Sequence, residues 1–157
     1  MEYRLIKQNE LNEEMINKLF EVESNSGGNP YDKDCFAEIL SHKTNLTFAC
    51  IDKKDIVGIL TINTKSKKFG GSAYIINISV RQEFHRQGLA TKLILEAVKY
   101  FKKNNFKKPI SLEVDKTNLP AYNLYLKLGF QLVDDFQDVE QFGLLTTLDN
   151  ITSKNKI

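Results

Sequence analysis

The chain has 157 residues, 41% of them hydrophobic, which is enough for one domain with a sizeable core and short for two. A formal net charge of +2, from 22 basic and 20 acidic side chains, gives no reason to expect nucleic acid or a membrane surface as partner. No run has the character of a signal peptide or a membrane span, and Cys35 and Cys50 are the only cysteines. We therefore expect a single domain over residues 1–157 of a cytoplasmic protein with reduced thiols.

Periodicity divides the first part of the chain into a strand, a helix, a breaker-rich loop and a second helix, at residues 2–8, 12–24, 25–30 and 31–43. In the first helix Met15, Leu19 and Val22 share one face, and Asn12 is a plausible N-cap. The period then changes to two, which predicts strands. Three segments rich in β-branched and aromatic residues read as an antiparallel meander, at residues 46–52, 55–65 and 72–80.

The second half of the chain alternates between helix and strand. A long helix follows residue 88, and another begins near Pro120 and ends at Gly129, where a C-terminal cap belongs. The strands expected around these helices are residues 110–114, 130–136 and 142–149. This order predicts an α/β protein of the α+β kind, with a mixed, mostly antiparallel sheet of six to seven strands and helices on both faces.

The segment that begins the long helix, called the helix entrance below, has small side chains, no acid and a positive charge. Residues 86–91 read Arg-Gln-Gly-Leu-Ala-Thr, so the unpaired N–H groups of a first helical turn come soon after the end of a strand. Gly88 and Ala90 add no bulk there, and Arg86 adds a charge to the helix dipole, which suits a pyrophosphate. The dinucleotide fingerprint and the P-loop are both excluded by spacing. Taken alone, the stretch is explained equally well as the ordinary start of a helix that happens to use Gly and Ala.

Together with residues 77–80 before it and residues 112–130 after it, this stretch resembles the acetyl-coenzyme A loop of the GCN5-related N-acetyltransferase (GNAT) superfamily. The resemblance covers about residues 46–133 well and the N-terminal helices loosely. Its second block is the more specific, with an acid in a strand, then Asn118 and Ala121, then Leu-Tyr-Leu-Lys-Leu-Gly-Phe. The spacing is nearest to that of bacterial enzymes that acetylate the N-terminal alanine of ribosomal proteins. A GNAT-like sheet is splayed between strands 4 and 5 to admit the pantetheine.

One position departs from the family pattern. Three residues before the loop glycine the family usually has Arg or Gln, whereas this chain has His85, followed by Arg86 and Gln87. Main-chain N–H groups from about Gln87 to Thr91 would hold most of the phosphate, so we expect the histidine to weaken binding modestly rather than abolish it.

The resemblance also implies roles for individual residues. Coenzyme contacts are implied for the strand backbone, the helix entrance and the start of the following helix: Ile78, Ser79, Val80, Arg86, Gln87, Gly88, Leu89, Ala90, Thr91, Asn118 and Ala121. Tyr125 would protonate the departing thiolate, and Glu113 matches the general base, acting directly or through a water. Acetyl-coenzyme A would be the cosubstrate, and no metal is expected.

Each of these residues has an ordinary structural alternative. Tyr125 lies on the apolar stripe of its helix and can be a core residue with a satisfied hydroxyl. Glu113 alternates with two apolar neighbours and can simply face solvent. Asn118 can be the helix N-cap, a role that is compatible with a cofactor contact.

The remaining polar and sulfur side chains give weaker signals. Cys35 and Cys50 fall on apolar faces and are expected in the core. His42 has no partner at motif distance, so we predict neither a metal site nor a thiol nucleophile. The lysine-rich residues 99–108 read as a solvated helix end rather than as a contact for an adenine 3′-phosphate or RNA.

Two loops are expected to decide the acceptor. Residues 134–141 would attract a cationic amine if they line the acceptor site, but they also suit a solvated hairpin. Their acids are Asp134, Asp135, Asp138 and Glu140. Residues 23–31 are the other expected wall.

We predict an acetyl-coenzyme A-dependent N-acetyltransferase that acts on a primary amine, in a peptide or protein N-terminus or a small molecule, by direct attack on the thioester. An α-amine with a pKa of about 8 is an easier nucleophile than lysine at about 10.4. The alternative is a non-catalytic acyl-coenzyme A-binding sensor or interaction module, against which Glu113, Asn118 and Tyr125 argue. A toxin-like enzyme acting on aminoacyl-tRNA is disfavoured by the near-neutral charge. We expect a monomer or homodimer without membrane or nucleic-acid partners.

Overall fold

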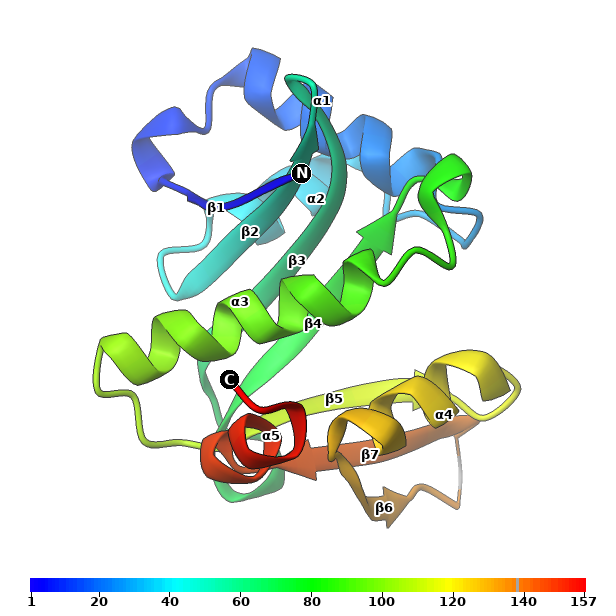
Figure 1. The fold of residues 1–157 in the computed structure, drawn as a ribbon. Helices are drawn as coiled ribbons and strands as arrows, with labels where there is room; N and C mark the ends of the chain where they lie inside the picture. The colour runs from blue at the N-terminus through cyan, green and yellow to red at the C-terminus, as the bar shows by residue number, and fades with distance from the viewer. Residues whose placement is uncertain (138) are drawn as a thin grey trace. The chain divides into compact units, whose positions relative to one another are not determined.

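The computed structural model describes residues 1–137 and 139–157, and in these it has seven strands and five α-helices (Figure 1). The strands are β1 (Glu2–Ile6), β2 (Asn45–Asp52), β3 (Asp55–Ser66), β4 (Ser72–Val80), β5 (Ile110–Asp115), β6 (Gln131–Asp135) and β7 (Gln141–Thr146). The α-helices are α1 (Glu13–Ser24), α2 (Lys33–Ser41), α3 (Leu89–Lys103), α4 (Leu119–Leu128) and α5 (Leu148–Asn155).

The strands form a seven-stranded sheet in the order β1-β2-β3-β4-β5-β7-β6. The pairs β1–β2, β2–β3, β5–β7 and β6–β7 are antiparallel, and β4–β5 is parallel. The predicted mixed, mostly antiparallel sheet is therefore confirmed, with seven strands.

The chain divides into two compact units. The first comprises residues Met1–Thr64 and Ile76–Ala97, and the second Lys65–Ile75 and Val98–Ile157. The boundaries fall inside regular elements, because β3, β4 and α3 each contribute residues to both units. The register of β4 with β5 lies in the second unit, where Ala73 is opposite Ile110 and Tyr74 is opposite Ser111.

In the first unit, α1 and α2 cover one face of the strands (Figure 1). Leu19 and Val22 of α1 pack with Phe36 and Leu40 of α2 and with Ile59 of β3 in one buried cluster. This confirms the predicted apolar face of the first helix.

The predicted N-cap of α1, Asn12, is also confirmed, because its side-chain oxygen accepts a hydrogen bond from the Met15 N–H at 2.8 Å.

The opposite face of the same strands receives the first part of α3. A Cβ built on Gly58, the residue before Ile59, would lie 3.3 Å from the side chain of Leu93. Successive residues of a strand point to opposite faces, so α3 packs on the face that α1 and α2 leave open. The glycine allows this close approach. Helices on both faces of the sheet were expected, and they are present in this unit.

In the second unit, α4 and α5 lie on one face of β5 and β7 (Figure 1). Leu112 and Leu144 pair across these strands and are both buried. Gly129 ends α4 in the left-handed conformation with φ 116°, and the amide of Asn150 on α5 donates to its carbonyl at 2.8 Å. The predicted C-terminal cap is therefore correct.

Helix α5 corrects the prediction of a strand at residues 142–149. The strand ends at Thr146, and the next residue, Thr147, caps α5 by accepting from the Asn150 N–H at 3.0 Å. Asp149 lies in the first turn, where an acid is favourable for the helix dipole. These start signals outweigh the β-branched character of the segment.

The cysteines differ in exposure. Cys50 is buried on β2, as expected, but Cys35 is exposed in the first turn of α2, so the prediction of a core position is wrong for it. The buried face of α2 is defined by Phe36 and Leu40, and a residue one position from Phe36 is rotated by about 100° around the helix. Among the described residues, no helix has the length and apolarity to cross a membrane.

Candidate active site

The entrance of α3 lies in the first unit and has an open, unusual backbone. A 3-10 turn (Gln82–Phe84) follows β4, and residues 85–88 are exposed. Arg86 and Gly88 have positive φ values of 62° and 79°, which is rare for arginine. A Cβ added at Gly88 would meet nothing within 4 Å. The loop therefore leaves space immediately before the helix.

Backbone N–H groups concentrate at this end of α3. The bond from the Lys92 N–H to the Gly88 carbonyl, at 3.0 Å, belongs to the helical ladder. The N–H groups of Leu89 to Thr91 precede that ladder and have no partner inside the helix. None of the first-turn residues, all of which the structure describes, is acidic. Donors, the positive dipole end and Arg86 together make an environment that suits a pyrophosphate.

His85, the departure from the family pattern, is engaged with the strand. Its Nε2 lies 2.7 Å from the backbone oxygen of Val80. A carbonyl oxygen can only accept, so Nε2 carries a proton and donates. The ring thus ties the turn to the end of β4.

A buried polar network holds the end of β4. Glu23, on the last turn of α1, is 4% exposed, and its Oε2 accepts from the Asn77 amide at 2.7 Å and from the Ser79 hydroxyl at 2.6 Å. The carboxylate therefore fixes two side chains of the strand whose backbone was predicted to contact the coenzyme. Sequence reasoning placed Glu23 only at the start of the expected acceptor wall at residues 23–31 and missed these contacts, although Glu23 follows Leu19 by four positions and so shares its buried face.

The loop between α1 and α2 lies beside the connection from β4 to α3. The Gln82 N–H donates to the Asn25 carbonyl at 2.9 Å. Gly27 has φ 90°, and a Cβ there would lie 2.4 Å from Nε2 of Gln82. Within the first unit, residues 23–31 are therefore adjacent to the turn that precedes the helix entrance.

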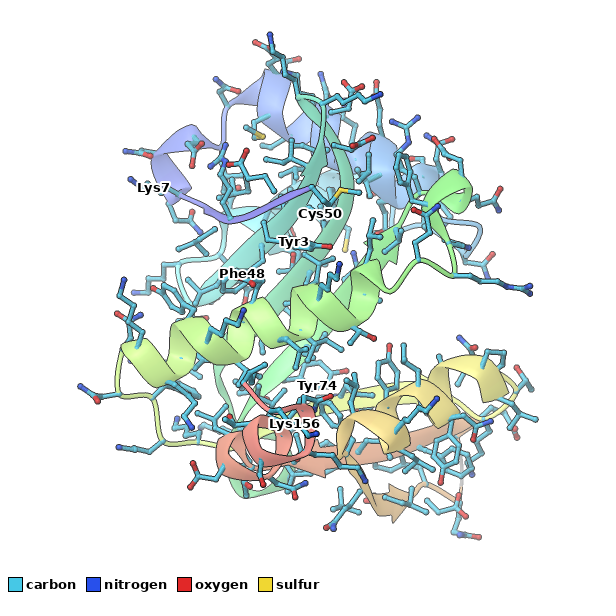
Figure 2. All side chains as sticks on the ribbon, viewed as in Figure 1. Tyr3, Lys7, Phe48, Cys50, Tyr74 and Lys156 are labelled. Atoms are coloured by element: carbon cyan, nitrogen blue, oxygen red, sulfur yellow. The ribbon has the colours of Figure 1, made fainter. Side chains whose placement is uncertain are left out.

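In the second unit, Glu113 of β5 lies between the buried Leu112 and Val114, as strand alternation predicted. It does not simply face solvent. Its carboxylate forms an ion pair with Lys68 of the β3–β4 connection, and the two side chains are 15% and 46% exposed respectively. The Lys68 ammonium also lies 4.4 Å from the centre of the Tyr74 ring, which is labelled in Figure 2.

The ammonium of Lys68 is stabilised in its charged form. Burial alone would lower its pKa, but the hydrogen bond to Glu113 and the interactions with Tyr74 and Glu113 raise the pKa above its ordinary value. Sequence reasoning missed both Lys68 and Tyr74. The available signal was the Lys-Phe-Gly-Gly sequence at residues 68–71, whose two glycines favour a turn, but a turn signal assigns no contacts to the side chains.

Phe69, the residue after Lys68, packs against strand β7. Phe69 has a positive φ of 53°, and a Cβ on Gly143 of β7 would lie 2.7 Å from its ring. Gly143 is the register partner of Glu113. The β3–β4 connection therefore packs directly on the β5–β7 pair beside Glu113, on the face opposite to α4 and α5.

On α4, Asn118 is the N-cap, since its side chain accepts from the Ala121 N–H at 3.2 Å. Tyr125 is partly buried and packs edge-on against Phe130, with ring centroids 5.9 Å apart. Burial raises the pKa of Tyr125 to about 12. The hydroxyl is therefore fully protonated near neutral pH and can donate a hydrogen bond.

One acid of the segment predicted to attract a cationic acceptor, residues 134–141, is paired with a lysine. Asp135 pairs with Lys116 at 2.5 Å, and the same ammonium donates to the Phe136 carbonyl at 2.8 Å. Asp134 and Glu140 are exposed, and Asp138 lies outside the described residues. Fewer acids are available to a cationic acceptor than the sequence suggested.

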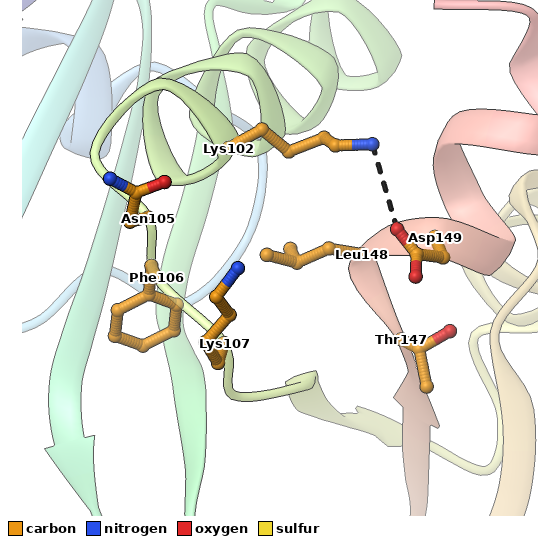
Figure 3. A pocket seen from close by; sticks show the side chains of 7 residues that line it. All are labelled: Lys102, Asn105, Phe106, Lys107, Thr147, Leu148 and Asp149. Atoms are coloured by element: carbon orange, nitrogen blue, oxygen red, sulfur yellow. Dashed lines mark ion pairs between the residues drawn. The ribbon is translucent and has the colours of Figure 1, made fainter.

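A cavity of about 280 Å³ lies elsewhere in the second unit, between the end of α3 and the start of α5 (Figure 3). Lys102 and Lys107 contribute to its lining, and Lys102 is 3.6 Å from Asp149. None of its lining residues was predicted as a site residue. Within the described part of the chain, no group of three or more His, Cys, Asp or Glu side chains could hold a metal ion.

Fold and site together define a class of protein. The mixed, mostly antiparallel sheet, with a fourth strand that leads into a helix whose first turn has no acid, fits the class of acetyl-coenzyme A-dependent acetyltransferases. Residues 13–130 match the model of the Acetyltransferase (GNAT) family. The chain belongs to this family, and the predicted family is confirmed.

Known proteins support this assignment. A Bacillus subtilis (strain 168) protein, provisionally named ribosomal protein bS18-alanine N-acetyltransferase, is 31% identical over 119 residues, which cover 75% of this chain and 76% of the relative. GCN5-related N-acetyltransferase 4, chloroplastic, of Arabidopsis thaliana is 33% identical over 93 residues, which cover 53% of this chain. That match spans 32% of the Arabidopsis protein, or about a third of its length.

A solved structure shares the fold. The PaiA N-acetyltransferase of Thermoplasma acidophilum, determined in complex with coenzyme A, superposes with a TM-score of 0.73 at 19% identity. The superposition covers 94% of this chain and 99% of the other.

Proposed function

We propose that the protein transfers the acetyl group of acetyl-coenzyme A to the α-amine of a peptide or protein N-terminus. The observation that carries the proposal is the bare, positive entrance of α3 in a chain of the GNAT family. The name of the Bacillus subtilis relative, an alanine N-acetyltransferase, supports an N-terminal acceptor.

The coenzyme would be held mainly by backbone groups. N–H groups from Gln87 to Thr91 would bind the pyrophosphate, and the open space at Gly88 would admit it. The backbone of Ile78–Val80 would bind the pantetheine and the thioester. The carboxylate of Glu23 supports this strand by fixing its polar side chains. Asn118 and Ala121 would contribute from α4.

The acceptor is favoured to be an α-amine for reasons of proton affinity. The nucleophile must be neutral, and lysine needs a pKa lowered by roughly 2 units more than an α-amine, which costs about 3 kcal/mol. Glu113 would accept the proton, directly or through a water. The pairing of Asp135 with Lys116 weakens the case for polyamines, because it removes one acid from the segment that would attract them.

The reaction breaks the thioester C–S bond as the amine nitrogen bonds to the carbonyl carbon. The thiolate leaves with the electron pair, and the amine proton goes to Glu113 or water. A coenzyme thiol resembles cysteine, with a pKa of about 8.5, whereas Tyr125 has a pKa of about 12. Complete proton transfer from Tyr125 to the thiolate is therefore unfavourable, and we expect the hydroxyl to donate a hydrogen bond to it.

Thiol release with three acceptors tests the proposal: an alanine-initiated peptide, a lysine-containing peptide blocked at its N-terminus, and spermidine. Mass spectrometry then locates the acetyl group. We expect acetylation of the alanine α-amine. Acetylation of the blocked lysine peptide alone would contradict the proposal, and coenzyme binding without turnover on any acceptor would favour a binding module.

A further inference from the structure

We propose that Glu113 and the Tyr74 ring form a subsite for a primary ammonium, and that Lys68 occupies this subsite as a competitor of the acceptor amine. Lys68 thereby determines acceptor selectivity. The inference rests on the proposed role of Glu113 as the base and adds a residue that no sequence motif contains.

The contacts of Lys68 are those by which a protein recognises an ammonium. The charged nitrogen is held by a carboxylate oxygen of Glu113 and lies over the face of Tyr74, 4.4 Å from the ring centre. Tyr74 is opposite Ser111 on β5, and Glu113 follows Ser111 by two residues, so all three side chains lie on one face of the strands. A lysine side chain ends in the same chemical group as an unreacted acceptor.

The position of this ammonium conflicts with catalysis by Glu113. A general base must lie within hydrogen-bond distance of the proton that it removes, or one water away. In the structure, the Lys68 ammonium donates a hydrogen bond to one oxygen of the Glu113 carboxylate, so this oxygen is already engaged. Its side chain is 46% exposed and reaches the site on a flexible stem, so it can leave when an acceptor amine arrives.

Displacement has a consequence for selectivity. Once released, the Lys68 ammonium remains close to the bound acceptor, because the β3–β4 connection is held by the packing of Phe69 on Gly143. An acceptor with a second positive charge beside its amine is repelled, and one with a neighbouring acid is attracted. We expect the wild type to prefer peptides that begin Ala-Glu over peptides that begin Ala-Lys.

Steady-state kinetics with these two peptides tests the inference. In Lys68→Met we expect KM for the acceptor to fall by about threefold to tenfold, since exposed ion pairs and cation–π contacts are individually weak. We expect kcat to stay within about twofold and the Ala-Lys peptide to gain more than the Ala-Glu peptide. The matched control is Lys67→Met, an exposed neighbour with the same change in charge, for which we expect no change in KM.

Two outcomes would overturn the inference. A fall in kcat at constant KM would mean that Lys68 supports Glu113 rather than competes with the acceptor. Equal KM values in wild type, Lys68→Met and Lys67→Met would reduce the ion pair to a structural contact. A melting curve for each variant establishes that it is folded.

A second measurement does not need turnover. Limited labelling with acetic anhydride, followed by peptide mapping, gives the ratio of modification at Lys68 to that at Lys67. We expect a low ratio in the free protein and a higher one in Glu113→Gln or with saturating Ala-Glu peptide, because the released amine reacts more readily.

The two measurements separate the two proposals. A ratio that rises with peptide, in a protein that acetylates no acceptor, would support the ammonium subsite and contradict the proposed transfer. Suppose instead that the protein acetylates the Ala-Glu peptide, that the labelling ratio does not change with peptide, and that wild type and Lys68→Met have equal KM values. This result would contradict the ammonium subsite and leave the proposed transfer intact.

Discussion

Gly88 combines open space with a backbone conformation that other residues resist, and the two properties can be separated by substitution. Any side chain at φ 79° costs roughly 1–2 kcal/mol of strain, whether it is alanine or glutamate. Glutamate adds bulk and a negative charge at the proposed pyrophosphate site. We expect Gly88→Glu to bind coenzyme A at least about tenfold more weakly than Gly88→Ala in calorimetry. Equal affinities would show that no anion binds there.

Tyr125 tests the chemistry of the leaving group. Tyr125→Phe keeps the edge-on packing against Phe130 and removes the hydroxyl. A hydrogen bond to a charged group contributes about 1.5–3 kcal/mol, so we expect turnover to fall by about 10- to 100-fold. Coenzyme affinity should change by less than about threefold. Single-turnover rates and calorimetry on the same preparation measure both, and wild-type turnover would make Tyr125 a packing residue.

The two cysteines should differ in reactivity. Cys35 is exposed, whereas Cys50 is buried near Tyr3 (Figure 2), and burial raises the pKa of its thiol. The thiolate is the reactive form, and access also limits the reaction. With iodoacetamide near neutral pH, we expect Cys35 to be alkylated at least about a hundredfold faster than Cys50. In guanidinium the two rates should converge, and fast labelling of Cys50 in the folded protein would contradict its burial.

Among the elements, the β3–β4 connection has the most specific packing. Gly143→Ala places a methyl group 2.7 Å from the Phe69 ring, and we expect a loss of about 1–3 kcal/mol in the free energy of unfolding, measured with urea. Gly28→Ala is the matched control, because a Cβ there has no neighbour within 4 Å. In a Phe69→Ala background the cost of Gly143→Ala should shrink. Additive losses would show that the ring moves aside freely.

At the same scale, elements with strong local signals were predicted well. Helix α1 followed from its cap and apolar face, and α4 from Asn118 and Gly129. The overlong final strand shows the limit, because the strand propensity of residues 142–149 and the helix start at Thr147 compete within one short segment. The cap at Thr147 and the acid at Asp149 favour the helix, and α5 also packs against α4.

The stability of the whole molecule should depend on pH in the alkaline range. Burial raises the pKa of Tyr125 from an ordinary value near 10 to about 12, and that of Tyr3 is raised as well. Below pH 10 both the folded and the unfolded states hold these protons, so these groups add no pH dependence. Between about pH 10 and 12 the unfolded chain loses them first, and stability falls by about 1.4 kcal/mol per pH unit for each group.

Urea unfolding at several pH values between 9 and 11.5 measures this slope. We expect the slope to be smaller in Tyr125→Phe than in the wild type by the contribution of one group. Identical slopes in the two proteins would mean that Tyr125 ionises equally in both states.

The sequence by itself determined the family, the order of most elements and the helix entrance at Arg86 to Thr91. These features are local, since caps, glycines and periodicity depend on residues a few positions apart. Only the tertiary structure decided the surroundings of the charged groups. Glu23 meets Ser79 across 56 positions and Lys68 meets Glu113 across 45, and no spacing rule connects residues so far apart. Their contacts depend on strand register and helix packing, which the whole fold sets.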